Sequence, residues 1–165
     1  MTHWPARNLE EVVSFLRTQH PGEKGMARAV SERLGVKPPT VSVVFKRDDA
    51  NLSWAEKVAG AYGFRLRLSF PEIKHNGAVL QDRVAAAVYP DAGNLTGLVE
   101  YVRQKNQTIN RFSQEVGMNY RIIERAFKKG DIKISTLKYI ERRLGIKVTW
   151  DWDRIPMPGG TGSQV

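Results

Sequence analysis

Cysteine is absent from the 165-residue sequence, and histidine occurs only three times, at His3, His20 and His75. The lack of thiols excludes disulfide bonds and thiolate metal sites. The scattered histidines form no H-E-x-x-H motif, and no glycine-rich segment has the Gly-Lys-Ser/Thr ending of a phosphate-binding loop. We therefore expect no metal ion, no cofactor and no enzymatic activity.

Long apolar runs are missing as well. No stretch approaches the roughly 20 apolar residues that a membrane-spanning helix requires. The opening MTHWPARNLE lacks the apolar segment of a secretory signal. These absences favour a cytoplasmic protein with no membrane partner.

Acidic residues are scarce relative to basic ones. The chain holds 26 Lys and Arg against 17 Asp and Glu, which gives a net charge of +9. Residues 1–70 carry 11 basic and 7 acidic side chains, residues 71–94 carry 2 and 3, and residues 95–165 carry 13 and 7. Both halves are basic and the middle is not, which favours a polyanionic partner.

The two basic halves are copies of one pattern. Shifting the chain by 82 positions superimposes identical residues without a gap, and a shift of 86 does the same upstream. The pairs are Ser31/Ser113, Gly35/Gly117, Phe45/Phe127, Lys46/Lys128, Asp49/Asp131, Ser53/Ser135 and Gly63/Gly145, and upstream Asn8/Asn94, Leu9/Leu95, Val13/Val99 and Arg17/Arg103. Such repetition predicts two tandem units of similar fold.

In each copy, the residue pattern predicts three helices, with a tight turn before the third. Asn8 and Asn94 are N-cap candidates for the first helix. The second helix ends at Gly35 and Gly117, where a left-handed C-cap favours glycine. The second helix is predicted over about 27–34 and 109–116, and the third over about 38–45 and 120–127.

A fourth helix and a strand complete each copy. The fourth helix is predicted to begin at Ser53 in the first copy, with Glu56 completing a capping box, and at Ser135 in the second. The alternating segments FRLRLSF and IKVTWDW predict a strand. The fold class is therefore mainly α, with two tandem bundles of four to five helices, each followed by a short β-strand.

The predicted domains follow from this pattern. They are a first bundle with its strand at 1–70, a linker at 71–93, a second bundle with its strand at 94–154 and a disordered tail at 155–165. The linker segment QDRVAAAVY predicts a short helix, and the tail is rich in Gly and Pro.

The two strands carry opposite charges on their polar faces. Arg65 and Arg67 alternate with apolar residues in the first strand, and Asp151 and Asp153 do so in the second. Opposite charges favour pairing across antiparallel strands. We predict that these strands pair and make the chain a single-chain pseudo-dimer. The alternative is that each strand only extends its own domain.

The segments ARAVSERLGVKPPTVSVVFKRDDANLSWAEKVAGAYGFRLRL and INRFSQEVGMNYRIIERAFKKGDIKISTLKYIERRLGIKVTW resemble the lambda-repressor-like helix-turn-helix family, in its Cro/C1-type or XRE branch. The resemblance implies that the third helix of each copy enters a major groove of double-stranded DNA. It also implies a transcriptional regulator, most simply a repressor of the kind found in phages or mobile elements.

The resemblance also assigns roles to single residues. The base-contacting positions of the second copy are Asn119, Tyr120, Arg121, Glu124 and Arg125. The phosphate or groove contacts are Lys37, Thr40, Ser42, Val43, Lys46, Arg47, Lys128 and Lys129. Arginine can bond guanine and asparagine adenine, whereas the first copy offers proline and valine at its base-facing positions. The second copy should therefore select the sequence, and the first should mainly hold phosphates.

Simpler interpretations stand beside these roles. Val43 can serve packing alone, and the lysines near the ends of the third helices are favoured there by the helix dipole without any ligand. At the level of function, the alternatives are a protein-interaction module of antitoxin or antiactivator type and an RNA-binding regulator. One chain can cover an operator by itself, or two chains can associate as a homodimer.

Overall fold

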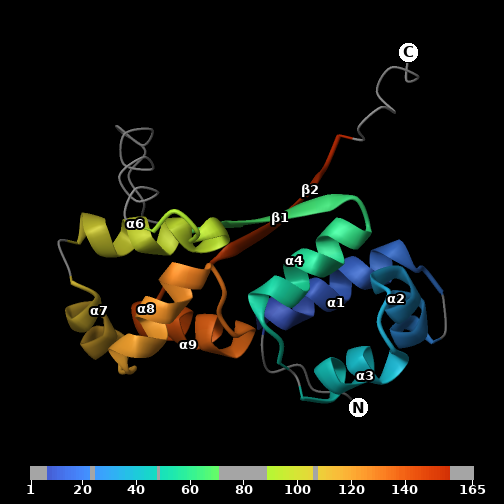
Figure 1. Cartoon of the computed structure of the whole chain (residues 1–165), viewed down its shortest axis with the longest axis horizontal. Helices are drawn as coiled ribbons and strands as arrows, with labels where there is room; N and C mark the ends of the chain where they lie inside the picture. Colours follow the sequence, from blue (N-terminus) through green and yellow to red (C-terminus); the bar gives the residue numbers. More distant parts are fainter. Residues whose placement is uncertain (1–6, 23–24, 48, 71–88, 106–107, 157–165) are drawn as a thin grey trace. The chain divides into compact units, whose positions relative to one another are not determined.

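Helices make up most of the structure. The computed structural model describes residues 7–22, 25–47, 49–70, 89–105 and 108–156. Within these residues the chain is mainly α-helical with two short strands, as predicted (Figure 1). No helix in these ranges is both long and apolar enough to cross a membrane.

The two copies contain the same series of elements. The first copy has α1 (Arg7–Gln19), α2 (Met26–Leu34), α3 (Pro38–Arg47), α4 (Leu52–Ala61) and β1 (Phe64–Ser69). The second has the 3-10 turn η1 (Gly93–Leu95), then α6 (Thr96–Gln104), α7 (Ile109–Val116), α8 (Tyr120–Lys129), α9 (Ile134–Leu144) and β2 (Thr149–Arg154). The predicted order of four helices and a strand is confirmed in both.

Glycine closes the second helix of each copy as predicted. Gly35 and Gly117 both have a φ of 71°, in the left-handed region that favours glycine. The residue after each glycine donates its N–H back into the helix, from Val36 to the Ser31 carbonyl at 3.0 Å and from Met118 to the Ser113 carbonyl at 2.8 Å. The two turns therefore have one geometry.

Some helix boundaries differ from the prediction. α4 and α9 begin at Leu52 and Ile134, so Ser53 and Ser135 lie inside the first turn and not at the N-cap. Both Leu52 and Ile134 are fully buried, so core packing favours the earlier start. α3 and α8 each continue two residues beyond the predicted end.

The bend before the fourth helix uses the same side-chain contact in both copies. The Asp49 carboxylate accepts the Ala50 N–H, and the Asp131 carboxylate accepts the Ile132 N–H, each at 2.9 Å. Short acidic side chains commonly satisfy turn amides in this way. The repeat therefore extends to the hydrogen bonds of the turn.

Each bundle encloses its own apolar core. In the first copy the fully buried residues include Leu9, Val12, Leu16, Val30, Val41, Leu52, Ala55, Val58 and Ala59. In the second they include Leu95, Leu98, Phe112, Val116, Ile123, Ile134 and Leu137. Helices this short owe most of their stability to such packing.

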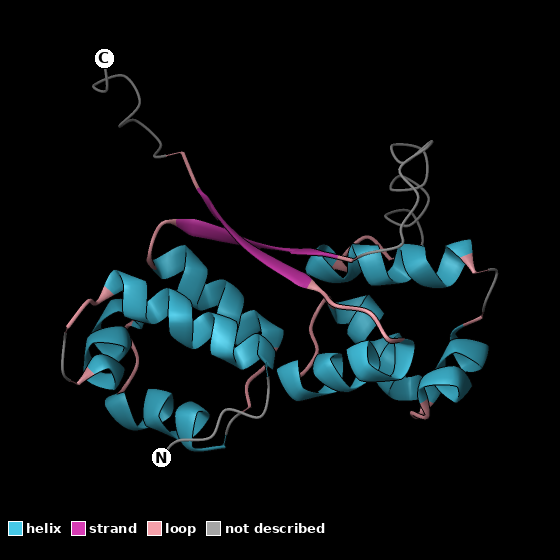
Figure 2. Ribbon diagram, turned by 180° about the vertical axis from the view of Figure 1, so that it is seen from behind, coloured by secondary structure: helices cyan, strands magenta, loops and turns pink. Residues whose placement is uncertain are grey.

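The two strands pair with each other, as predicted (Figure 2). They run antiparallel, and the Ile155 N–H donates to the Gly63 carbonyl at 2.9 Å just beyond the strand ends. This register places Arg67 opposite Asp151 and Arg65 opposite Asp153.

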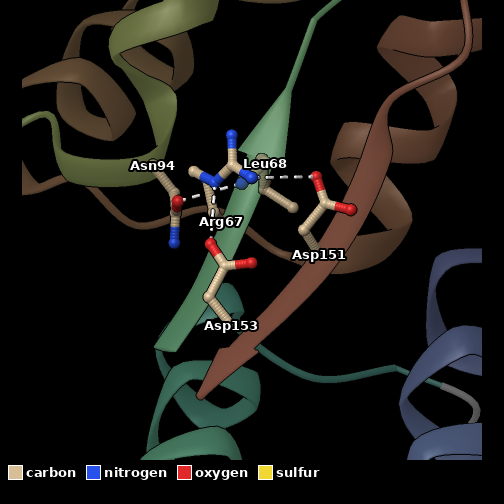
Figure 3. Close-up of polar contacts among 5 residues, drawn as sticks. All are labelled: Arg67, Leu68, Asn94, Asp151 and Asp153. Carbon is tan, nitrogen blue, oxygen red and sulfur yellow. Dashed lines mark hydrogen bonds and ion pairs between the residues drawn. The ribbon is translucent and has the colours of Figure 1, made fainter. Parts of the chain in front are cut away.

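Among the described residues, Arg67 makes the ion pairs between the two strands. Its Nε lies 2.9 Å from Asp153 Oδ2 and its Nη2 lies 3.6 Å from Asp151 Oδ2 (Figure 3). The hydrogen bond with Asp153, with attraction to both carboxylates, raises the pKa of Arg67. Arg65 is exposed and makes no ion pair with either aspartate in the described part of the chain. The twist of a two-stranded ribbon brings diagonal neighbours within reach of long side chains, and Asp153 bonds diagonally.

The packing divides the chain into two compact units. The first unit runs to residue 67 and resumes at residue 150, and the second spans residues 68–149. In the first unit, Trp152 of β2 stacks on Phe15 of α1. In the second unit, Phe70 just after β1 lies directly over Gly97 of α6. Trp152 therefore packs within the first unit, and Phe70 packs within the second.

The predicted asparagine caps are not found. Asn94 lies within η1, and its Oδ1 accepts the Leu68 N–H at 3.0 Å (Figure 3). Asn94 thus satisfies the backbone of an incoming strand and does not cap α6. Asn8 lies inside α1, which begins one residue earlier.

Part of the predicted linker belongs to the second unit. The ring of Tyr89 meets that of Phe127 edge to face, with centroids 5.5 Å apart, and Ala92 is fully buried. The predicted linker helix lies outside the described residues except for Tyr89, and the predicted tail does so except for Ile155 and Pro156.

Candidate nucleic-acid interface

Side-chain caps fix the starts of α7 and α8. Thr108 Oγ1 accepts the Arg111 N–H at 3.1 Å at the start of α7. Asn119 Oδ1 accepts the Arg121 N–H at 2.9 Å at the start of α8. Between them Gly117 makes the tight turn, so α8 leaves the turn in a defined direction. The Thr108 cap was missed in the sequence, although a threonine directly before an apolar periodic segment is an N-cap signal.

One face of α8 is anchored in the core of the second unit. Ile123, Ala126 and Phe127 are exposed by only 0%, 4% and 1%. Phe127 also contacts Tyr89, and the backbone carbonyls of residues 91 and 92 lie against the C-cap glycine of α8. The helix is therefore held along its inner side and at its C-terminal end.

The opposite face of α8 is exposed and basic. With about 3.6 residues per turn, Arg121 and Arg125 lie nearly opposite the three buried residues. Both arginines are exposed, as are Lys128 and Lys129 in the last turn. Guanidinium groups in this arrangement can donate pairs of hydrogen bonds to one planar acceptor edge.

Asn119 has a structural role that the sequence did not reveal. Its side-chain oxygen is engaged with the backbone of Arg121, while the residue is exposed. Both halves of the amide are needed for a bidentate contact with adenine. The capping bond therefore leaves the amide nitrogen as the group of this side chain that can donate to a ligand.

Glu124 is also partly engaged within the second unit. Its carboxylate lies 3.7 Å from Lys128 Nζ, one turn along α8, and its side chain is 39% exposed. Burial, with the nearby Glu124 carboxylate, raises the pKa of Tyr89. These neighbours reduce the freedom of Glu124 to accept a hydrogen bond from cytosine.

Two large apolar side chains on α8 face solvent. Tyr120 is 42% exposed and Ile122 is 49% exposed. The prediction included Tyr120 but not Ile122. Helical periodicity could have found Ile122, because it falls outside the stripe formed by Ile123, Ala126 and Phe127.

The third helix of the first unit presents a different surface. Val41 is fully buried and anchors α3, whereas the predicted contact residues around it are exposed. These residues are Lys37, Thr40, Ser42, Val43, Lys46 and Arg47. Val43 is 41% exposed, so part of its side chain faces solvent and part is covered within the protein. Lys46 and Arg47 lie in the last turn of α3, where the helix dipole also favours them.

The start of α3 offers few hydrogen-bond donors. Pro38 and Pro39 form its first turn, both are exposed, and neither has a backbone N–H. Thr40 donates its N–H to the Lys37 carbonyl at 2.9 Å. The outward start of α3 is therefore uncharged apart from Lys37. The shift of 82 positions places Pro39 and Val43 where α8 has Arg121 and Arg125.

The chain matches no protein-family model, no curated protein and no solved structure. The two copies can be compared with each other. They share the turn glycines and the Asp49 and Asp131 turn bonds, and they differ at the outward positions of α3 and α8. Some of the differences between the copies thus lie at the candidate interface.

Proposed function

We propose that the protein is a sequence-specific double-stranded DNA-binding regulator of the lambda-repressor-like helix-turn-helix type, acting as a repressor by occupying its operator. The outward pair Arg121 and Arg125 carries the proposal. These arginines stand one turn apart on the face of α8 opposite its buried residues. A major groove admits a helix of this kind, and arginine bonds the O6 and N7 atoms of guanine.

Basic residues of both units supply affinity without regard to sequence. They are Lys37, Lys46 and Arg47 on or before α3, and Lys128 and Lys129 on α8. Lysine and arginine that neutralise phosphates release counterions, which makes binding strongly dependent on salt. Thr40 and Ser42 add neutral donors to the backbone, and the net charge of +9 acts in the same direction.

The two units divide the work of recognition. α8 selects bases through Arg121 and Arg125, with Asn119 donating through its free amide nitrogen and Tyr120 on the flank. α3 holds the backbone, because Pro38 and Pro39 offer no donor and Val43 offers only methyl contacts. A chain with these unequal units suits an operator in which one half is strictly specified and the other half tolerates several sequences. The protein acts in the cytoplasm.

A salt series with duplex DNA tests this proposal. The full chain is titrated into a labelled random-sequence duplex from about 50 to 200 mM KCl, and the preferred sequence is then selected from a random pool. We expect affinity to fall steeply with salt and the pool to converge on a site with guanines. The absence of any salt-dependent duplex binding would overturn the proposal.

Competition with other nucleic acids tests whether the protein prefers duplex DNA. Single-stranded DNA and double-stranded RNA of the selected sequence should compete weakly, because a deep, narrow RNA groove does not admit a helix. Equal competition by RNA would favour the RNA-binding alternative.

A protein-interaction module is the second candidate, and the surface of α3 favours it. Pro38, Pro39 and Val43 are exposed together on a helix that lacks base-contacting side chains. If this surface binds a protein, Val43→Asp abolishes that association and leaves sequence selection by α8 unchanged. If it lies on DNA, the same change weakens all duplexes, because a carboxylate faces the phosphates.

A further inference from the structure

Ile122 is an exposed aliphatic residue on the helix proposed to select bases. It is 49% exposed, more than Tyr120 and Val43, the other large apolar residues exposed in the described ranges. Its neighbour Ile123 is fully buried and provides the anchor for this turn of α8. The packing of the second unit therefore does not account for a large apolar side chain at position 122.

The first copy supports the same conclusion. The shift of 82 positions pairs Ile122 with Thr40, which is also exposed. The adjacent position is apolar and buried in both copies, as Val41 and Ile123. The bundle thus requires an apolar residue at the inner position and accepts a small polar one at the outer position.

The surroundings of Ile122 restrict what can cover it. Arg121 precedes it, and Arg125 lies one turn further along the same side of the helix, both exposed. An apolar protein surface that covered Ile122 would also remove both arginine side chains from water. Burying a charged group without a partner costs free energy. A DNA groove offers acceptors to the arginines and one apolar group, the C5-methyl of thymine.

We propose that Ile122 contacts the C5-methyl group of a thymine beside the guanine that Arg121 or Arg125 bonds, so that it selects thymine at that position. This inference rests on the proposed function. It assigns the selection of an A·T pair to an aliphatic contact by Ile122, a residue that was not among the contacts predicted from the sequence.

Deoxyuridine provides a direct probe, because it differs from thymidine only by the missing methyl group. In the selected duplex each thymine is replaced in turn, and the affinity of the full chain is measured. We expect the replacement at one position, next to a guanine, to lower the affinity about fourfold. This is the effect of removing one methyl group from an apolar contact. Ile122→Ala should bind the thymine duplex more weakly and show no further loss with deoxyuridine there.

Val43→Ala is the matched control, since it trims an aliphatic side chain of similar exposure on α3. It should leave the deoxyuridine penalty at that position unchanged. Ile122→Ala should also keep its urea midpoint, because the residue is half exposed and alanine favours the helix. If Ile122→Ala loses affinity for DNA but keeps its stability, the loss comes from a missing contact with DNA and not from impaired folding.

The outcomes distinguish this inference from the function it rests on. Salt-dependent, selective duplex binding with no deoxyuridine penalty, or with a penalty that persists in Ile122→Ala, overturns the inference and leaves the DNA-binding function intact. Unchanged affinity of Ile122→Ala for every duplex overturns it as well. The absence of duplex binding overturns both.

Discussion

Trp152 at the end of the second copy's strand stacks flat on Phe15 in the first helix of the chain, with ring centroids 4.1 Å apart and planes 7° apart. Phe15 also meets Tyr62 and Phe64 edge to face, at 5.9 and 5.3 Å. The aromatic cluster of the first unit is therefore completed by a residue from the far end of the sequence. The first unit cannot be cut from the chain at residue 70 without losing this ring.

Replacing that ring should destabilise the first unit. We expect Trp152→Ala to lower the free energy of unfolding by about 2 to 3 kcal/mol, because Phe15 is buried but Trp152 is itself partly exposed. Trp152→Phe should lose less. Urea denaturation gives the loss, and hydrogen exchange locates it. Amides of α1 should lose more protection than those of α7, and Thr149→Ala, an exposed change in the same strand, should have little effect. Greater loss of protection in α7 would contradict the assignment.

The strand ion pairs predict an order of effects and a dependence on salt. Asp153→Asn should lower the urea midpoint more than Asp151→Asn, because Asp153 is 2.9 Å from Arg67 and Asp151 is 3.6 Å away. Both losses should shrink at about 1 M NaCl, since the groups are exposed and screened. The reverse order at low salt would contradict the geometry.

The raised pKa of Arg67 sets the pH range of these effects. A group whose pKa is raised by folding contributes stability below its unfolded pKa, and that contribution is lost only as the pH rises past the folded value. For arginine this lies far above neutrality. The Arg67 contribution should therefore be constant from about pH 6 to 9.

Two helical glycines should respond to alanine in opposite directions. A Cβ on Gly97 would lie 2.5 Å from the Phe70 ring, which is buried, whereas a Cβ on Gly60 in α4 would meet nothing within 4 Å. We expect Gly97→Ala to destabilise the protein by about 1 to 2 kcal/mol through crowding, and Gly60→Ala to stabilise it by about 0.5 to 1 kcal/mol through helix propensity. Urea denaturation measures both. A stabilising Gly97→Ala would show that Phe70 does not dock on α6.

The two roles of Asn119 can be separated with serine. Asn119→Ala should cost about 1 kcal/mol of stability, because the N-cap bond to the Arg121 N–H is lost. Asn119→Ser keeps a capping oxygen, so stability should be retained, while the missing amide donor should weaken binding to the selected duplex by about threefold to tenfold. Full affinity of Asn119→Ser would restrict this residue to capping.

Base contact and phosphate contact should differ in their dependence on sequence and salt. Arg121→Ala or Arg125→Ala should cost about 1 to 3 kcal/mol on the selected duplex and relax the preference at one position. Lys46→Ala should weaken all duplexes similarly and reduce the salt slope by about one unit.

Arg142→Ala is the control for these changes. It removes the same charge from an exposed position of the same unit, on α9. It should cost less on the selected duplex than either α8 change. Equal losses from Arg121→Ala on random and selected DNA, or an unchanged salt slope in Lys46→Ala, would contradict the assigned roles.

Local features of the sequence were sufficient to predict the order of elements. The spacing of apolar residues marked the helices, because one face of each must be buried, and Gly35 and Gly117 marked turns that need a positive φ. The outward position of Arg121 and Arg125 followed from the same periodicity. Even the strand pairing was predictable, because strands with opposite charges on their polar faces favour each other.

Other features depended on contacts between distant parts of the chain. Asn94 carries a cap signal, yet it binds Leu68 from the strand of the first copy. Trp152 lies in β2 and Phe70 lies just after β1, in segments of similar sequence pattern, and nothing local tells which unit buries them. The exposure of Ile122 beside the buried Ile123 likewise depends on how α8 sits in its bundle. The sequence by itself determined which segments form elements, since periodicity and backbone preference act within a few residues. Only the tertiary structure decided which unit covers each strand end, because burial is a property of neighbours that the chain brings together from far apart.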